Sequence, residues 1–340
     1  MKILIIRLSA IGDVIHVLPS INLLRHYFIN DHISWVICDK ASDLIDTNPL
    51  INKVYRVSNN FPNSIVSDYK TIRELSKIDW DIIIDYHLIL KSFILKLFLK
   101  GPVYTYSYED CYRLEEKISY CLSTHNVGKI YAENKIVRNI RLTEYVIKKY
   151  KNLLNITYDL DIKRFKIYKF SNKGTDWLIN NNILDFVTIC VNCCGKSRMW
   201  KKEKWISLIN LLIKSNINIV LLGLDYSEDG LYLKNKFINN NNVKISPPLS
   251  LTESCHILEK TKLLIAIDSS ILHLSNYIST KTLGLFGPTC AIYNGSYYPN
   301  FNYIQSPSSK NFINHKNLKD NKCINDITAN NVFDIILTLI

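Results

Sequence analysis

Short apolar runs alternate with amphipathic stretches along the first half of the chain. The run from Ile3 to Ile6 is followed by a tight loop, Ser9 to Gly12, and apolar positions at helical spacing begin near Asp13. This alternation is typical of βαβ units built around a parallel sheet. We predict strands near 2–7, 32–38, 53–57, 81–85 and 102–106, and helices near 13–28, 66–76, 88–99, 113–122 and 133–151.

The alternation starts again after residues 152–172, which lack a clear period and are the best candidate for a linker. A chain of 340 residues is long for one core and sufficient for two domains of about 150 residues each. We therefore expect an α/β protein with domains 1–160 and 161–340. The second set comprises strands near 186–191, 217–223, 263–267 and 282–286, and helices near 203–215, 228–239, 252–260, 270–278 and 328–339.

Asp13 follows the first predicted strand and Gly12. In an open α/β sheet, ligands bind where the carboxyl end of a strand meets the start of the next helix. Gly12 permits close approach of a ligand, and Asp13 supplies a carboxylate at this place. Asp is also favoured as a helix cap, so these residues alone leave both interpretations open.

The net charge of +12, from 42 basic and 30 acidic residues, favours an anionic partner. Nucleic acid, a phosphorylated sugar and an acidic membrane surface all fit this charge, but no nucleic-acid-binding motif accompanies it. The N-terminal apolar run is too short for a signal peptide. The apolar stretch 81–99 contains Asp85, His87, Lys91 and Lys96, which are costly in a bilayer. We therefore expect a cytoplasmic protein.

Several common cofactor sites are disfavoured. The chain has no G-x-G-x-x-G after a strand and no Walker-type Gly-Lys-Thr, which argues against a nicotinamide oxidoreductase or a P-loop ATPase. Cys190 and Cys193 form a C-x-x-C with Cys194 adjacent, but no second pair lies at zinc spacing among the nine cysteines. We expect core or site-wall thiols rather than a metal or redox centre.

Two strand-to-helix loops in the second half carry groups suited to phosphate. Asp268 to His273 follows a strand and opens a helix, whose first N–H groups bind anions well. The loop after 186–191 contains Arg198, whose guanidinium can bridge two phosphate oxygens. An ordinary capped helix and a solvated charged loop remain the alternatives at these two places.

Together these segments resemble glycosyltransferase family nine, the lipopolysaccharide heptosyltransferases, and most of all its heptosyltransferase I type. The resemblance implies a GT-B fold, in which two Rossmann-like domains face each other across a cleft and the last helix packs back on the first domain. The matching segments fall in family order over nearly the whole chain: residues 2–19, Trp35-Val36-Ile37, Asp85 with Leu90-Lys91-Ser92, Trp200, Asp268 to His273, and Gly287-Pro288-Thr289.

The resemblance also implies the reaction and its site. An inverting transferase of this type moves heptose from ADP-heptose to the Kdo sugar of Kdo-lipid A, with Asp13 as the general base. It implies no obligatory metal, no nucleic-acid partner and peripheral attachment to the cytoplasmic face of the inner membrane. Arg7, Lys91 and Arg113 fall on the acceptor side, with Lys135 as a further cation. The donor side comprises Cys193, Cys194, Arg198, Glu228, Leu249, Asp268, Ser269, Ser270 and His273.

Some donor positions depart from the family pattern. Ser270 replaces a glycine, Cys193 and Cys194 stand where threonines are usual, and Arg198 stands for a lysine. Glu228 is only a stand-in for the acidic residue that binds the donor ribose. Two alternatives therefore stay open: heptosyltransferase II or another family-nine enzyme with a different acceptor, and a degenerate binder of sugar nucleotides without catalysis.

Overall fold

The computed structural model describes residues 1–46, 48–130, 133–156, 171–193, 195–310 and 322–340. The chain forms two compact units, Met1–Tyr168 and Lys169–Ile340. The domain boundary expected at 160–161 lies outside the described residues, as do residues 157–170 of the linker expected at 152–172.

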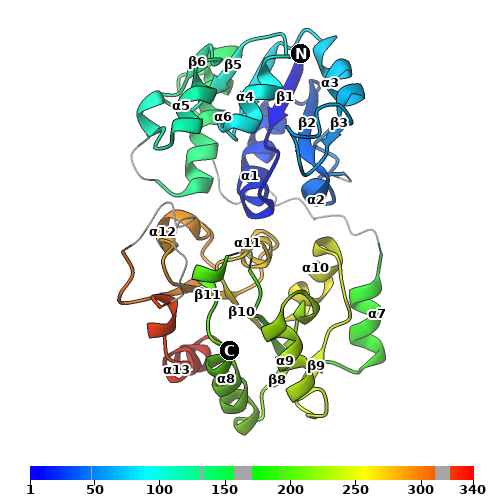
Figure 1. Cartoon of the computed structure of the whole chain (residues 1–340), viewed down its shortest axis with the longest axis vertical. Helices are drawn as coiled ribbons and strands as arrows, with labels where there is room; N and C mark the ends of the chain where they lie inside the picture. Colours follow the sequence, from blue (N-terminus) through cyan, green and yellow to red (C-terminus); the bar gives the residue numbers. More distant parts are fainter. Residues whose placement is uncertain (47, 131–132, 157–170, 194, 311–321) are drawn as a thin grey trace. The chain divides into compact units, whose positions relative to one another are not determined.

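The first unit is a parallel sheet of six strands in the order β3-β2-β1-β4-β5-β6, with helices on both sides (Figure 1). Its strands are β1 (Lys2–Ile6), β2 (His32–Cys38), β3 (Lys53–Val57), β4 (Ile82–Asp85), β5 (Val103–Thr105) and β6 (His125–Asn126). Its helices are α1 (Ile11–Tyr27), α2 (Asp39–Ser42), α3 (Tyr69–Ser76), α4 (Leu90–Lys96), α5 (Leu114–Tyr120) and α6 (Lys135–Lys151).

The second unit repeats the design with the strand order β12-β11-β10-β7-β8-β9, again all parallel. Its strands are β7 (Phe186–Cys190), β8 (Asn218–Leu221), β9 (Val243–Ile245), β10 (Leu263–Ile267), β11 (Thr282–Phe286) and β12 (Phe301–Gln305). Its helices are α7 (Lys173–Asn180), α8 (Lys202–Lys214), α9 (Glu228–Phe237), α10 (Leu251–Lys260), α11 (Ser270–Tyr277), α12 (Ala291–Asn294) and α13 (Ala329–Leu339).

In each unit the first strand lies third in the sheet, with the fourth strand beside it, which is the Rossmann order. The order reverses between β1 and β4 in the first unit and between β7 and β10 in the second. Ligands of such sheets bind outside the carboxyl ends of the strands at this switch point. The predicted α/β class with two parallel sheets is confirmed.

Continuous apolar runs form the central strands because helices cover both faces of each sheet. Ile3 to Ile6 are fully buried, as are Leu263 to Ile267. Each unit has its own core, one including Leu4, Val36 and Ile83, the other Ile189, Trp205 and Ile265.

Helix α13 contributes to the core of the second unit. Val332 and Ile336 are fully buried there, packed among the residues of α8 and Trp200. The apolar face of the helix thus belongs to the core of its own unit, and the packing on the first domain that the resemblance implied stays a prediction. Within the described part of the chain, no helix is both long and apolar enough to span a membrane.

Candidate active site

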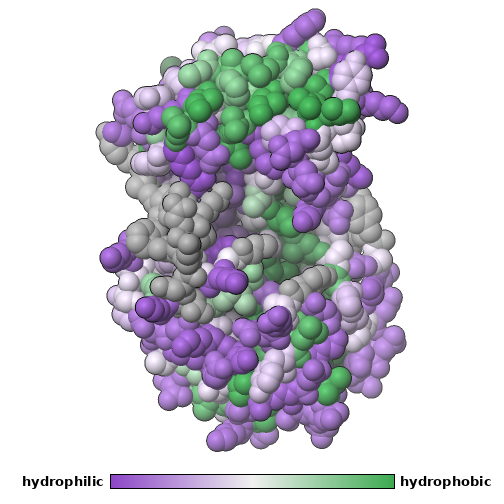
Figure 2. Space-filling model, in the orientation of Figure 1, coloured by the Kyte–Doolittle hydropathy of each residue, from purple (hydrophilic) through white to green (hydrophobic). Residues whose placement is uncertain are grey.

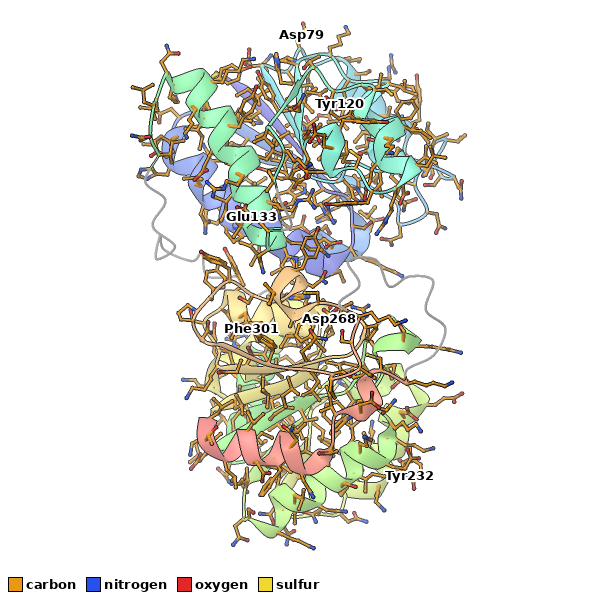
Figure 3. The ribbon with its side chains drawn as sticks, turned by 90° about the vertical axis from the view of Figure 1, so that its left-hand side faces the viewer. Asp79, Tyr120, Glu133, Tyr232, Asp268 and Phe301 are labelled. Carbon is orange, nitrogen blue, oxygen red and sulfur yellow. The ribbon has the colours of Figure 1, made fainter. Side chains whose placement is uncertain are left out.

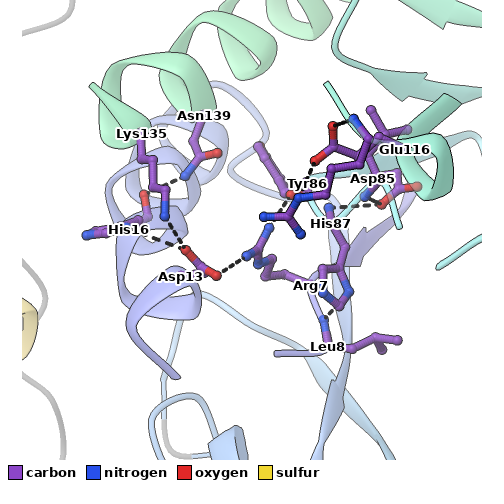
Figure 4. Close-up of polar contacts among 12 residues, drawn as sticks. Arg7, Leu8, Asp13, His16, Asp85, Tyr86, His87, Glu116, Lys135 and Asn139 are labelled. Atoms are coloured by element: carbon purple, nitrogen blue, oxygen red, sulfur yellow. Dashed lines mark hydrogen bonds and ion pairs between the residues drawn. The ribbon is translucent and has the colours of Figure 1, made fainter. Parts of the chain in front are cut away.

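Asp13 lies in the first turn of α1, at the switch point of the first sheet, but it does not cap the helix. Ala10 is the N-cap residue and makes no side-chain bond. The Asp13 carboxylate instead contacts three basic groups: Arg7 Nη2 at 2.6 Å, Lys135 Nζ at 3.2 Å and His16 Nδ1 at 4.0 Å (Figure 4). The helix-cap interpretation is therefore replaced by an ion-pair cluster.

This cluster sets the protonation of Asp13. Burial by itself would raise the pKa of the carboxyl group, but Lys135, Arg7 and His16 together hold that pKa well below its ordinary value. Asp13 is therefore a carboxylate at neutral pH. Its side chain is 30% exposed, so a ligand can reach it.

Arg7 is fixed by its surroundings. Its Nη1 donates to the carbonyl of Tyr86 at 2.6 Å, and its own carbonyl accepts the indole N–H of Trp35 at 3.0 Å. Lys135 reaches Asp13 because α6 packs on α1, where the Asn139 amide donates to the carbonyl of His16 at 2.9 Å. The sequence had suggested Lys135 only as a further cation, and His16, Tyr86 and Asn139 were not among the predicted residues.

A buried ion pair supports the loop after β4. The Asp85 carboxylate lies 2.9 Å from Lys96 Nζ, and both side chains are fully buried. Asp85 also accepts the N–H groups of His87 and Leu88, each at 2.9 Å. Burial raises the pKa of Asp85, but Lys96 and the N–H group of Leu88 bring it below its ordinary value. The Asp85 side chain thus shapes the loop that brings His87 to the switch point.

His87 is a neutral imidazole beside Arg7. The N–H of Leu8 points to its Nδ1 at 3.4 Å, which assigns the proton to Nε2. Burial and the charge of Arg7 lower the pKa of His87 to about 3. The sequence did not predict a neutral histidine beside Arg7, because a single histidine after a strand can be a surface residue, a core residue or a ligand.

The other two predicted acceptor residues differ in how far their charge is compensated. Lys91 is half-buried on α4, and its Nζ donates to the carbonyl of Asn59 at 3.2 Å. Arg113 lies 3.1 Å from Glu115 and 3.8 Å from Glu116 at the start of α5. No hydrogen bond or ion pair between described residues links either of them to Asp13.

In the second unit, the predicted donor residues of two loops come together. Arg198 Nη1 donates to the carbonyl of Asp268 at 2.8 Å and lies 3.3 Å from its carboxylate. His273 Nε2 lies 3.2 Å from the same carboxylate. Burial raises the pKa of Asp268, but His273, Arg198 and Thr289 hold that pKa far below its ordinary value. Asp268 lies at the carboxyl end of the interior strand β10 (Figure 3).

Helix α11 begins directly after Asp268. Ser269 is its N-cap residue but makes no side-chain capping bond, and its buried Oγ has no hydrogen-bond partner. Ser270 is the first helical residue and is partly exposed. A buried hydroxyl without a partner beside the N–H groups of a helix start favours an anion with oxygen acceptors at this place.

The remaining donor candidates are less closely associated with this cluster. The Cys193 thiol points to the carbonyl of Gly195 at 3.2 Å and packs near Met199, and Cys194 lies outside the described residues. Glu228 is exposed at the start of α9, and Leu249 is buried before α10.

Asn192 joins the loops after β7 and β8, and the sequence did not single it out. Its amide donates to the carbonyl of Gly223 and its oxygen accepts the hydroxyl of Ser227. No group of three or more His, Cys, Asp or Glu suited to a metal occurs in the described ranges. Burial raises the pKa of the Cys190 thiol to about 11, so this thiol is protonated at neutral pH.

Comparison with known proteins gives a family and several relatives. Residues 69–324 match the family model described as glycosyltransferase family 9 (heptosyltransferase). A lipopolysaccharide heptosyltransferase 1 of Campylobacter coli is 25% identical over 348 aligned positions, which cover 100% of this chain and 99% of the relative.

Solved structures show the same fold. Escherichia coli heptosyltransferase WaaC with ADP superposes with a TM-score of 0.77 at 19% identity, covering 100% of both chains. E. coli ADP-heptose lipopolysaccharide heptosyltransferase II gives 0.74 at 15% identity, covering 100% of this chain and 98% of the other. The iron-containing dodecameric glycosyltransferase TibC of E. coli gives 0.53 at 11% identity, covering 99% and 78%. The similarity to the two heptosyltransferases identifies the fold as GT-B, as expected.

Proposed function

The chain belongs to glycosyltransferase family 9, the heptosyltransferases, and on that basis we propose that it transfers heptose from ADP-heptose to the Kdo sugar of Kdo-lipid A. The observation that carries the proposal is that each unit has its charged cluster at the switch point of its sheet. The first cluster has the partly exposed Asp13 carboxylate, and the second has Arg198, the Ser269 hydroxyl without a partner and the start of α11 beside the buried Asp268 carboxylate. These are the two chemistries that a general base and a diphosphate require.

The diphosphate of the donor is assigned to the second unit. Arg198 supplies charge-assisted hydrogen bonds, and Ser269, Ser270 and the first N–H groups of α11 supply neutral ones. As the bond between the anomeric carbon and the diphosphate breaks, negative charge grows on the leaving ADP. Donors fixed before the reaction stabilise this charge without reorganisation.

The acceptor is assigned to the first unit. Asp13 removes the proton of the acceptor hydroxyl while the hydroxyl oxygen attacks the anomeric carbon. The attack comes from the face opposite ADP and therefore inverts the configuration. General-base help of this kind contributes about a hundred- to ten-thousandfold in rate. Arg7 orients the carboxylate, since it is itself bonded to the carbonyl of Tyr86.

We further propose that no metal is needed, because Arg198 and the start of α11 already supply positive potential to the diphosphate. WaaC has been solved with ADP, and TibC is described as iron-containing, so a metal has to be tested for directly. Activity that survives EDTA treatment, followed by dialysis into metal-free buffer, supports the proposal. Loss of activity that Mg²⁺ or iron restores contradicts it.

The direct test is incubation of the protein with ADP-heptose and Kdo-lipid A. A gain of one heptose in the acceptor mass, with release of ADP, is the expected result. A lipid A precursor that already carries one heptose tests the heptosyltransferase II alternative, which the similar TM-scores of WaaC and heptosyltransferase II keep relevant. ADP binding without transfer to either acceptor identifies a non-catalytic binder.

Peripheral attachment to the inner membrane has support on the first unit. Leu90, Leu97 and Phe98 of the α4 region are 45%, 57% and 39% exposed, and Leu114 of α5 is 75% exposed. Figure 2 shows hydrophobic surface over this part of the unit. Apolar side chains among lysines such as Lys91 favour an anionic bilayer surface. Cosedimentation with vesicles containing anionic lipid, but not with neutral vesicles, is expected. Replacement of Leu97 and Phe98 by Ser should reduce it.

A further inference from the structure

Asp13 is held in a state that opposes proton uptake. Its Oδ2 lies 2.6 Å from Arg7 Nη2, and its Oδ1 lies 3.2 Å from Lys135 Nζ (Figure 4). A general base works best when one oxygen can accept the hydroxyl proton and when its pKa approaches the working pH. With a cation on each oxygen, the carboxylate is well oriented but weakly basic.

The two cations are held to different degrees. The Arg7 side chain is 14% exposed, and its second nitrogen is bonded to the carbonyl of Tyr86. The Lys135 side chain is 31% exposed and starts from the first residue of α6. A lysine stem has four rotatable bonds, so its ammonium group can exchange one anion for another without movement of the backbone. Lys135 is therefore the cation that can leave Asp13.

We propose that Lys135 is a positioning residue that pairs with Asp13 in the absence of acceptor and moves to the carboxylate of the acceptor sugar when the acceptor binds. This inference rests on the proposed function, because it needs an anionic acceptor. Departure of Lys135 frees Oδ1 for the hydroxyl proton and removes one of the charges that weaken the base. The enzyme then acquires its base only when an acceptor with an anionic group is in place.

The other charged or titratable groups around Asp13 do not alter the conclusion that departure of Lys135 makes Asp13 a stronger base. Arg7, from the loop after β1, stays bonded to Tyr86, and His16 lies beside Asp13 on α1. His87, from the loop after β4, has its pKa lowered to about 3 and stays neutral. Lys135 is thus the partner whose movement changes the charge at Asp13.

A binding measurement tests the inference without turnover. Carbon-13 signals of the aspartate carboxyls, assigned for Asp13 with the Asp13→Asn variant, give its pKa with and without a deacylated Kdo-containing acceptor. The pKa should rise on acceptor binding in the wild type. In Lys135→Gln it should already be raised in the free protein and change little on binding. Lys148→Gln, an exposed lysine of the same helix, serves as the matched control. An unchanged pKa of Asp13 on binding overturns the inference.

Kinetics with altered acceptors identify the anion. Amidation of the Kdo carboxylate should lower kcat/KM of the wild type about tenfold and that of Lys135→Gln less than twofold, since the interaction is already lost. An equal loss in both proteins overturns the assignment to the carboxylate. Removal of the lipid A phosphates is the second comparison. If only this change lowers kcat/KM more in the wild type than in Lys135→Gln, the assignment to the carboxylate is overturned and a phosphate is the partner of Lys135. Transfer with an unmoved Asp13 pKa refutes this inference alone, whereas absence of heptose transfer to any acceptor refutes the proposed function as well.

Discussion

Arg198 contacts Asp268 twice, since its Nη1 donates to the backbone carbonyl at 2.8 Å and lies 3.3 Å from the carboxylate. Arg7 occupies the corresponding place in the first unit. It follows the first strand of its sheet, and its Nη1 donates to the carbonyl of Tyr86, the first residue after the fourth strand. Asp268 is likewise the first residue after the fourth strand of the second unit. At each switch point, an arginine therefore donates to a backbone carbonyl and also contacts a carboxylate.

Replacement of Asp13 by Asn should abolish most of the chemistry. The change keeps the shape of the side chain but removes the base, so kcat should fall about a hundredfold or more. ADP affinity, measured by calorimetry, should stay near that of the wild type because the proposed donor residues lie in the other unit. Asp79→Asn, on an exposed residue, is the matched control. Unchanged turnover of the Asp13 variant would mean that the carboxylate only organises its neighbours.

Truncation of Arg198 to Ala should weaken donor binding. Charge-assisted hydrogen bonds contribute about 1.5–3 kcal/mol, which corresponds to a loss of about ten- to a hundredfold in ADP affinity. The exposed Lys196 in the same segment is the control, and its Ala variant should bind ADP nearly as the wild type does. Equal ADP binding by wild type and the Arg198 variant would remove the guanidinium from the donor site.

Lys91 and Arg113 should contribute unequally to acceptor use. Two glutamates already lie next to Arg113, whereas Lys91 contacts a backbone carbonyl, which carries no net charge. We expect Lys91→Ala to raise the acceptor KM about tenfold, Arg113→Ala to raise it less than about threefold, and ADP binding to stay intact in both and in the double variant. The effect should shrink in high salt, because the screening length falls from about 10 Å at 0.1 M to about 3 Å at 1 M. A double variant that lost ADP but kept the acceptor would reverse the assignment of the two units.

His87 should make the first unit sensitive to mild acid. Its pKa is about 3 in the folded chain, below its ordinary value of about 6.5, so the unfolded chain binds one more proton between these values. Stability therefore rises with pH across this window and is lost as the pH falls from about 6.5 towards 3, by about 1.4 kcal/mol per pH unit for this one group. Urea unfolding at several pH values should show a shallower dependence for His87→Gln. Identical slopes for the two proteins would contradict the neutral assignment.

The central strands could be predicted closely because buried parallel strands are continuous apolar runs. Observed β2, β3, β10 and β11 have the predicted bounds, and β1 and β7 end one residue earlier. The strands that were missed, β6, β9 and β12, are short or partly exposed and lie at or near the sheet edges, where one face or one side lacks a buried neighbour. The four-residue helices α2 and α12 and the helix α7 have too few apolar positions to show a period.

The contact between the loops of Arg198 and Asp268 could be anticipated because each residue follows a strand of a recognisable pattern. The pairing of Asp13 with Lys135 could not, since the two residues are 122 positions apart and Lys135 is one of 42 basic residues. Only the packing of α6 on α1 selects it. The same reason explains why the contacts of Arg113 with Glu115 and Glu116 could not be predicted, because they depend on where the side chains lie.

Trp200 connects the loop that carries Arg198 to the segment before α13 by a hydrogen bond. Its indole N–H donates to the carbonyl of Ile327 at 3.0 Å, and the N–H of Lys201 donates to the Asn325 side chain at 2.9 Å. The segment before α13 is thus tied two residues away from the proposed diphosphate cation. An affinity tag or a deletion that disturbs α13 would accordingly register as weakened nucleotide binding, although it touches no ligand.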